Sequence, residues 1–375
     1  MLDVREGALW PLDLFMGIAE QLVNLARFKL GAVRPICGPM KVQWELTYHC
    51  NLKCLHCQIW KTPLEEIRKN TLTLPQQKKI IDDLASSGVR HVSFSGGEMF
   101  LQKTVYELIA HAKASGMKVG GNSNAFLINE KIAKKIADCG LDMLYISLDG
   151  DNAATHDEIR GIPGAFDRVF TAVKNLRAAK PSMGIFFNTT INNKNVDQLL
   201  GIAKLAKEAG VNGLTIEMTN TFDKYSPNRA LILPDDKLPA LKAQIAEMFE
   251  KYPDLLPHPK GYFDEFETYL KRPEELYKYR CVAGYTSAQI HPNGDLYPCP
   301  VAFKKMGNLT EKSFSEIWFS PEADAVRQDI KNKKHPICWV TCVSPLNQYL
   351  SYVAPKADFF KLLNPNTISH ILKKI

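Results

Sequence analysis

Short β-rich runs alternate with helical stretches from residue 41 to about residue 220, and this alternation restricts the chain to few folds. A repeated strand–helix pattern is typical of a parallel sheet covered by helices. Six such strands suggest either an open doubly wound sheet or an incomplete barrel, and in both the chemistry lies at the carboxyl ends of the strands. The predicted strands are residues 41–47, 89–95, 117–123, 143–149, 184–191 and 211–218.

The helical stretches between these strands carry recognisable start and stop signals. In the segment "LPQQKKIIDDLASSG", Thr73 can cap the helix and Pro75 fits its first turn. Ile80, Ile81 and Leu84 then share one face. Several of these stretches stop at a glycine, as helices often do. We therefore expect helices with one apolar face to pack on the sheet.

Composition and charge exclude several classes of protein. An apolar fraction of 45% with 23% charged residues, over 375 residues, is typical of a soluble globular protein with one large domain and a smaller one. Asp3, Glu6 and Asp13 stand where a signal peptide would be basic and then apolar, so a cytoplasmic location is expected. The net charge of +7 counts every thiol as neutral, and no basic stripe is interleaved with aromatic residues, so no nucleic-acid partner is expected.

Three of the nine cysteines, Cys50, Cys54 and Cys57, lie in the segment "WELTYHCNLKCLHCQIW" directly after the first predicted strand. In a reducing compartment such a group is more often a metal site than a set of disulfides. Three thiolates on one tight loop suit an iron–sulfur cluster, and a four-iron cluster held by three cysteines leaves one iron free for another ligand. A zinc site completed by His49 or His56 is the alternative from the spacing.

The loop and its setting resemble the radical S-adenosylmethionine (SAM) superfamily, in which the open iron chelates the amino and carboxylate groups of SAM. "SGGE" at residues 95–98 resembles the GGE motif of that family, and "NSN", "ISLDG" and "IRG" resemble later SAM-contacting elements. The resemblance implies that glycines let the backbone approach SAM, that a carboxylate meets its amino group and that an arginine meets its carboxylate. The implied cofactor-binding residues are Gly96, Gly97, Glu98, Asn124, Ser147, Arg160 and Asn188.

The resemblance also implies a reaction. A reduced cluster passes one electron to the sulfonium of SAM, methionine leaves, and a 5′-deoxyadenosyl radical takes hydrogen from a substrate carbon. An electron donor such as flavodoxin or ferredoxin would reduce the cluster. The protein would position the reactants and exclude water. A metal-binding scaffold without catalysis is the alternative from another class of function.

A second group of cysteines follows in the C-terminal region, where "IHPNGDLYPC" predicts a hairpin turning at Asn293-Gly294. This region resembles the SPASM extension, or its shorter Twitch form, which holds auxiliary 4Fe-4S clusters. A full SPASM extension carries more cysteines for two clusters, so the four here imply one auxiliary cluster and two clusters in the whole chain. Zinc is the alternative from spacing alone. The four residues are Cys281, Cys299, Cys338 and Cys342.

The expected fold is α/β, a partial (β/α)6 TIM-like barrel with a small C-terminal iron–sulfur domain. Five parts are expected along the chain. They are an N-terminal amphipathic helical segment (1–40), the radical SAM core (41–220), a helical linker (221–280), a Twitch-like domain (281–345) and an amphipathic tail (346–375).

Both ends carry apolar stripes. Leu14, Ile18, Leu22 and Leu25 share one helical face near the N-terminus, and the tail places apolar residues beside lysines. Such stripes more often pack on the domain, but they also suit peripheral contact with a membrane. The segment before Cys50 is shorter than the peptide-binding domain that many peptide maturases of this family carry. These features favour a small-molecule or lipid substrate, with a peptide or protein substrate as the alternative.

Overall fold

The computed structural model describes residues 12–219, 229–301 and 303–352, and six strands alternate with helices in the predicted order. Each strand pairs in parallel with its neighbour in sequence. The prediction of six consecutive strand–helix units is therefore confirmed. The strands are β1 (Lys41–Thr47), β2 (His91–Gly96), β3 (Lys118–Ser123), β4 (Met143–Ser147), β5 (Gly184–Ile191) and β6 (Gly213–Met218).

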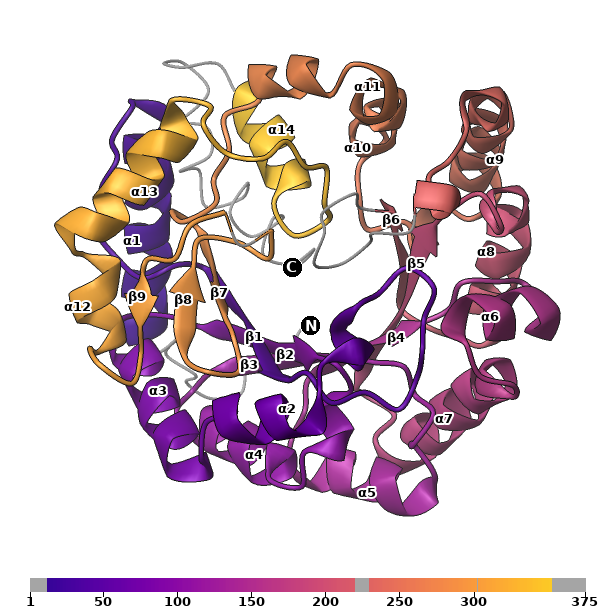
Figure 1. Ribbon diagram of the computed structural model, residues 1–375, viewed down its shortest axis with the longest axis horizontal. Coiled ribbons are helices and arrows are strands. Elements are labelled where there is room, and N and C mark those ends of the chain that lie inside the picture. Colours follow the sequence, from indigo (N-terminus) through magenta and orange to yellow (C-terminus); the bar gives the residue numbers. More distant parts are fainter. Residues whose placement is uncertain (1–11, 220–228, 302, 353–375) are drawn as a thin grey trace, which may run out of the picture.

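Figure 1 shows the six strands as an arc with helices along its outer side. Thr73 caps α3 as expected, since its N–H donates to Gln76 Oε1 at 2.9 Å in a capping box. Fully buried Val42, Trp44 and Leu46 belong to the main apolar core. The helices in this part are α2 (Leu64–Asn70), α3 (Leu74–Ser86), α4 (Val105–Ala114), α5 (Glu130–Asp138), α6 (Ala153–Arg160), α7 (Ala165–Ala179) and α8 (Leu199–Glu208).

The sheet does not end at β1. Strand β7 (Ser287–Ile290) pairs in parallel with β1, and β8 (Asp295–Tyr297) and β9 (Gly307–Asn308) follow in antiparallel order. Gly294 turns between β7 and β8 with φ +86°, so the predicted hairpin is confirmed. The C-terminal extension thus continues the sheet of the core, while the domain boundaries expected from the sequence stay a prediction.

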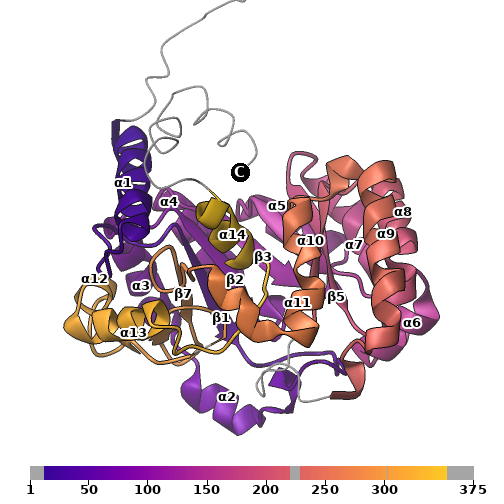
Figure 2. The same cartoon turned by 90° about the horizontal axis from the view of Figure 1, so that it is seen from above.

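Helices from the second half of the chain lie across the open side of the arc. Figures 1 and 2 show α10, α11 and α14 in this position. The Trp339 indole donates to the Tyr262 carbonyl at 2.8 Å and stacks on the Tyr262 ring, which ties the second cysteine region to α10. These helices are α9 (Leu238–Lys251), α10 (Lys260–Asp264), α11 (Phe266–Lys271), α12 (Phe314–Trp318), α13 (Pro321–Lys331) and α14 (Ser344–Tyr352).

The N-terminal helix α1 (Leu12–Lys29) packs on the C-terminal region. Phe28 is 4% exposed, and its ring centre lies 5.1 Å from that of Tyr285. The Arg280 guanidinium lies 3.9 Å from the centre of the Phe28 ring. Leu25 of the predicted apolar stripe packs against the buried cluster that contains Phe28, so this part of the stripe contacts the rest of the protein. The side chains of Leu14 and Ile18 and the tail from residue 353 lie outside the described residues.

No helix in the described ranges is long and apolar enough to cross a bilayer.

We predict that Phe28→Ala destabilises the protein by about 3–5 kcal/mol, because it removes a buried ring from between α1 and Tyr285. Thermal unfolding of the anaerobically purified protein measures the change. Val23→Ala on the same helix is the control, since Val23 is 49% exposed and its truncation should have little effect. Equal unfolding temperatures for the two variants would contradict the packing of α1 described above.

Candidate active site

The cysteine loop, residues 48–58, leaves the end of β1 and is held on one side by the segment that follows β2. The Gly97 N–H donates to the Thr47 carbonyl at 2.7 Å, and the Glu98 N–H donates to the His49 carbonyl at 2.8 Å. These backbone bonds fix the start of the loop to the carboxyl edge of the sheet. The position agrees with the expectation for a parallel α/β fold.

Two glycines make this close approach possible. A Cβ atom on Gly96 would lie 2.2 Å from the Thr47 carbonyl oxygen, and one on Gly97 would lie 2.1 Å from that of His49. Gly96 also has φ +121°, which side chains rarely tolerate. The sequence motif was expected to admit SAM; the structure shows that its glycines also admit the backbone of the cysteine loop.

The end of α6 holds the other side of the cysteine loop. The Lys53 N–H donates to the Arg160 carbonyl at 3.3 Å, and the Leu55 N–H donates to the Ile159 carbonyl at 2.8 Å. Gly161 ends α6 with φ +70°, and a Cβ there would lie 2.4 Å from the Lys53 carbonyl oxygen. The "IRG" motif therefore supports the cysteine loop through its backbone.

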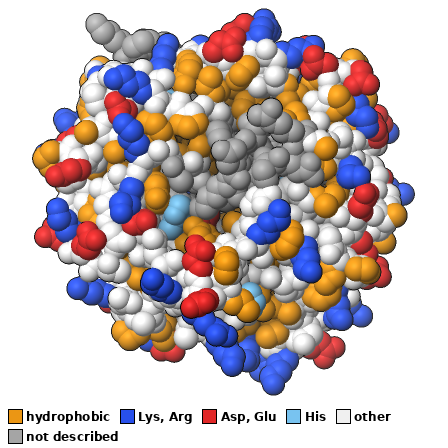
Figure 3. Space-filling model, in the orientation of Figure 1, with side chains coloured by type: hydrophobic (Ala, Val, Ile, Leu, Met, Phe, Trp, Pro, Cys, Tyr) orange, Lys and Arg blue, Asp and Glu red, His pale blue; other side chains and the backbone are white. Residues whose placement is uncertain are grey.

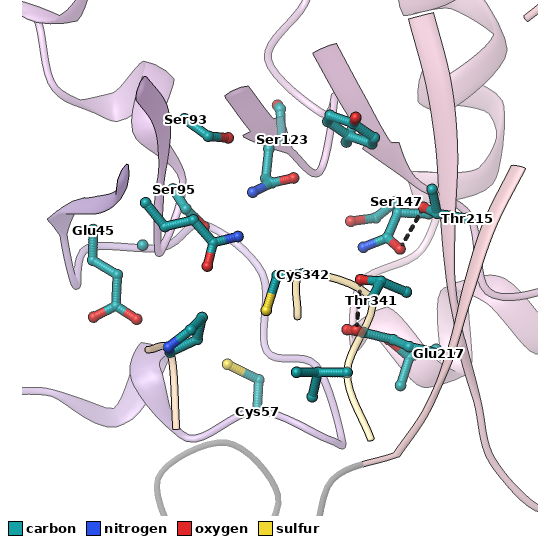
Figure 4. A pocket seen from close by; sticks show the side chains of 18 of the residues that line it. Glu45, Cys57, Ser93, Ser95, Ser123, Ser147, Thr215, Glu217, Thr341 and Cys342 are labelled. Carbon is teal, nitrogen blue, oxygen red and sulfur yellow. Dashed lines mark hydrogen bonds between the residues drawn. The ribbon is translucent and has the colours of Figure 1, made fainter. Parts of the chain in front are cut away.

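The three cysteines of the loop line a cavity of about 400 Å³. This volume is within the usual range for sites that bind small molecules. Figure 4 shows Cys57 pointing into this cavity, with Ser93 and Ser95 on one side and Ser147 and Glu217 on the other. Of the seven residues predicted to contact SAM, six line the same cavity: Gly96, Gly97, Asn124, Ser147, Arg160 and Asn188.

Glu98 differs from the expectation, because it does not line this cavity. Its carboxylate is fully buried and accepts hydrogen bonds from Ser123 Oγ at 3.0 Å, the Asn124 N–H at 2.8 Å and the Phe100 N–H at 3.2 Å. Burial raises the pKa of Glu98 to about 7, although these hydrogen bonds act in the opposite direction. The structure thus gives Glu98 a role in fixing the end of β3, and its contact with SAM stays a prediction.

Arg160 is buried beside the cysteine loop. One of its terminal nitrogens lies 2.7 Å from Asp149 Oδ2, and the other donates to Cys54 Sγ at 3.8 Å. Its Nε is buried and has no hydrogen-bond partner among the described residues. A buried donor without a partner is costly, so a ligand that accepts a hydrogen bond there would stabilise the site. The predicted contact of Arg160 with the carboxylate of SAM fits this geometry and stays a prediction.

The other predicted contacts differ in how much of each side chain is already used. The Asn124 amide donates to Asn51 Oδ1 at 2.9 Å and lies 3.9 Å from Cys50 Sγ, so it helps to fix the cysteine loop. Asn188 Oδ1 accepts from Thr215 Oγ1 at 2.9 Å, which leaves its amide hydrogens for a ligand. Ser147 points into the cavity from the end of β4 (Figure 4).

The four C-terminal cysteines also gather. Three of them line one small cavity, and Cys338 and Cys342 pack against the same apolar cluster. In the described ranges, no three His, Cys, Asp or Glu side chains lie close enough together to hold a single metal ion.

Both cysteine groups border the same cavity. Cys342 and its neighbour Thr341 line the cavity that also exposes Cys57 (Figure 4). Burial raises the pKa of Cys342 to about 12 and that of Cys57 to about 11, so the free thiols are protonated near neutral pH. Cluster binding must therefore displace protons from these thiols.

Sequence reasoning missed the polar lining of the barrel. Lys41, Gln43 and Glu45 of β1 all face the cavity, as does Glu217 of β6, which accepts a hydrogen bond from Thr341 Oγ1 at 3.1 Å. Burial raises the pKa of Glu217. A signal was present, because "KVQWELT" alternates polar and apolar residues where a buried parallel strand is normally apolar on both faces.

Comparison with known proteins identifies the family. The family model described as the radical SAM superfamily matches residues 44–206, and one described as an iron-sulfur cluster-binding domain, the SPASM model, matches residues 281–343. The chain is also 30% identical to an AdoMet-dependent heme synthase of Methanosarcina barkeri, over 76% of this chain and 83% of the relative. The chain belongs to the radical SAM superfamily.

Other similar proteins differ in name but share this architecture. The mycofactocin maturase MftC of Mycolicibacterium smegmatis is 31% identical over 78% of this chain and 72% of its own length. The crystal structure of Streptococcus suis SuiB bound to precursor peptide SuiA superimposes with a TM-score of 0.63 at 18% identity, covering 87% of this chain and 74% of SuiB. The similarity to SuiB, at this level of identity, shows that the two proteins share a fold.

Membership of this family makes the protein an enzyme that uses SAM and two 4Fe-4S clusters. The donor sets fit these groups: three thiols on the cysteine loop for the SAM-binding cluster, and four in the C-terminal region for the auxiliary cluster. The unpartnered Nε of Arg160 fits a carboxylate ligand beside the first cluster.

We predict that Gly97→Ala prevents assembly of the SAM-binding cluster, because the added methyl would collide with the His49 carbonyl. The iron content after anaerobic reconstitution should fall from about eight to about four atoms per chain, with the auxiliary cluster retained. Gly116→Ala is the control: Gly116 also has positive φ but has nothing within 4 Å of the added Cβ. Full iron content in Gly97→Ala would contradict the proposed support of the loop.

We predict that Arg160→Met weakens SAM binding by about tenfold to a hundredfold, since hydrogen bonds to charged groups contribute about 1.5–3 kcal/mol. Equilibrium binding of labelled SAM to the reconstituted protein measures this change. Arg160→Met also leaves Asp149 unpaired, so Asp149→Asn is added in a double variant to relieve that buried charge.

The double variant should recover stability but not SAM affinity, and exposed Arg168→Met should change neither. Wild-type SAM affinity in the double variant would exclude Arg160 as a SAM ligand.

Proposed function

We propose that this enzyme abstracts hydrogen from a residue of a peptide or protein substrate bound in the cavity between the two cluster sites. The observation that carries the proposal is the polarity of the barrel interior. TIM barrels usually fill this space with layers of branched apolar side chains. Here the residues with side chains that line the cavity from the strands are Lys41, Gln43, Glu45, Ser93, Ser95, Asn122, Ser123, Tyr145, Ser147, Asn188, Thr190, Thr215, Glu217 and Gln289.

A polar wall selects among substrate classes. An alkyl chain would leave the unpartnered groups of this wall, such as Ser93 Oγ and Gln289 Oε1, without a hydrogen bond, at a cost of about 1–3 kcal/mol for each buried group. A peptide offers an N–H and a C=O at nearly every residue and can satisfy such groups. A peptide therefore replaces the lipid or small molecule that the ends of the chain favoured.

A solved structure of the same fold supports a peptide. SuiB, which shares this fold, has been solved with a precursor peptide bound. On the face shown in Figure 3, Lys and Arg side chains are interspersed with Asp and Glu around the rim, a mixed surface that gives no support to a nucleic-acid partner.

A tetrapyrrole is the second candidate substrate. The heme synthase of Methanosarcina barkeri supports it, because the match covers 83% of that relative. A tetrapyrrole is a broad apolar ring with carboxylates only at its edge, however, and the faces of the ring offer no partner to the unpaired Ser93 Oγ and Gln289 Oε1. The wall thus fits a peptide better.

In this proposal each part of the chain has a defined task. SAM bound at the first cluster supplies a 5′-deoxyadenosyl radical. The cysteine loop holds that cluster, while Arg160, Asn188 and Ser147 orient SAM at the carboxyl edge of the sheet. The helices α10, α11 and α14 cover the open side and exclude water. The Glu217 carboxylate, with its raised pKa, can hold a proton near the substrate.

The test uses anaerobically reconstituted enzyme with SAM and dithionite. We expect a peptide encoded by a short reading frame beside the gene to increase 5′-deoxyadenosine formation several-fold and to change mass. Fe-coproporphyrin III and phospholipid vesicles serve as the competing substrates. Stimulation by the porphyrin or the vesicles, with every peptide unchanged in mass, would overturn the peptide assignment.

A further inference from the structure

The cavity wall formed by β2, β1 and β7 carries a row of polar side chains that the reaction described above does not use. Gln43 of β1 stands opposite Ser93 of β2 and opposite Gln289 of β7 in the strand register. All three line the cavity, and neighbouring strands are about 4.8 Å apart. The three side chains therefore form one continuous row.

Two members of this row have unmet hydrogen-bonding capacity. Ser93 is 1% exposed and Gln289 is 2% exposed, yet Ser93 Oγ and Gln289 Oε1 have no hydrogen-bond partner among the described residues. Buried polar groups are nearly always paired, so these atoms point to a ligand. Gly120, beside Ser93 on β3, has no side chain to cover the hydroxyl, whereas an added Cβ there would contact Ser93 Oγ at 3.4 Å.

A positive charge lies next to this row. Lys41 precedes Gln43 by two residues on β1, so both side chains lie on the same face, about 7 Å apart along the strand. The Lys41 ammonium lines the cavity and makes no hydrogen bond or ion pair with any described residue. Burial lowers the pKa of Lys41, which shows how little water surrounds it.

The donors and acceptors of this wall define the chemistry of a ligand. Lys41, the Gln43 amide and the Ser93 hydroxyl can donate to a carboxylate. The unpartnered Gln289 Oε1 is an acceptor and calls for an N–H donor. A peptide unit with a carboxylate and a nearby amide N–H meets both demands, whereas a hydrocarbon chain meets neither.

We propose that Lys41, Gln43, Ser93 and Gln289 form a substrate subsite that binds a carboxylate-bearing residue of the peptide, with the amide N–H of that residue donating to Gln289. The inference rests on the proposed peptide-modifying function and names the group by which the peptide is recognised. The carboxylate can come from an acidic side chain or from a C-terminus, and the test distinguishes the two.

The experiment measures equilibrium binding of three short peptides to the enzyme loaded with both clusters and SAM. The probes are acetyl-Gly-Glu-Gly-amide, acetyl-Gly-Gln-Gly-amide and acetyl-Gly-Gly-Gly with a free C-terminus. At least one carboxylate peptide should bind about tenfold or more tightly than the glutamine peptide, as expected for a hydrogen bond to a charged group. The tighter of the two carboxylate peptides identifies the source of the carboxylate.

Variants assign the preference to the subsite. Lys41→Met should abolish the preference for a carboxylate, Lys41→Arg should keep part of it, and exposed Lys118→Met should leave it unchanged. If Lys41→Met loses cluster absorbance, Gln289→Leu is used as the test variant in its place. Gln289→Leu should weaken the binding of all three peptides alike, because each peptide donates an N–H.

Lys41 also lies near Cys342, so it could instead balance the charge of the auxiliary cluster. In that case Lys41→Met would shift the reduction potential of that cluster and leave peptide preference intact, which would overturn the subsite. Equal binding of all three peptides by the wild type would overturn it as well. A carboxylate preference that depends on Lys41, without peptide modification in turnover assays, would contradict the proposed function and leave the subsite standing.

Discussion

The site depends on backbone hydrogen bonds that hold the cysteine loop from two sides. One pair joins it to Gly97 and Glu98 after β2, and the other joins it to Ile159 and Arg160 at the end of α6. A cluster with one open iron needs three thiols in a fixed arrangement, and a loop tied down on one side would leave part of that arrangement mobile. These contacts explain the glycines at positions 97 and 161, because a side chain there would collide with the backbone of the cysteine loop.

The continuous sheet explains how the two cysteine groups come to share one cavity. Strand β7 pairs with β1, so the C-terminal extension begins beside the strand that leads into the cysteine loop. The chain then returns through Thr341 and Cys342 to the opposite wall, where Thr341 meets Glu217 of β6. A substrate in this space borders both cluster sites, an arrangement suited to removal of hydrogen at one and electron transfer at the other.

Much of this architecture could be predicted from the sequence, because it depends on local signals. The strand β1, the cap at Thr73 and the turn at Gly294 all follow from short-range patterns. The cysteines could be grouped from their spacing and from a resemblance to a known family. The hydrogen bonds of Glu98 could not be predicted in this way, because its partners at the end of β3 become neighbours only when β2 and β3 pair. The pairing of Glu217 with Thr341 has the same origin, since 124 residues separate them.

The polar interior has a local signal in the sequence of β1. Lys41, Gln43 and Glu45 alternate with Val42, Trp44 and Leu46, which is unusual for a strand buried on both faces. The apolar stripes at the ends favour a lipid instead. The structure packs Leu25 of one stripe against a buried cluster and gives the cavity a polar wall, so the substrate is better inferred from the strands than from the ends.

In the proposed reaction, hydrogen is abstracted from a peptide residue held between the two cluster sites. Transfer of deuterium from a peptide labelled residue by residue into 5′-deoxyadenosine, followed by mass spectrometry, tests this step. We expect deuterium in 5′-deoxyadenosine from one labelled residue, with a matching mass change in the peptide. Unlabelled 5′-deoxyadenosine from every labelled peptide, with deuterium acquired instead from a labelled tetrapyrrole or lipid, would contradict it.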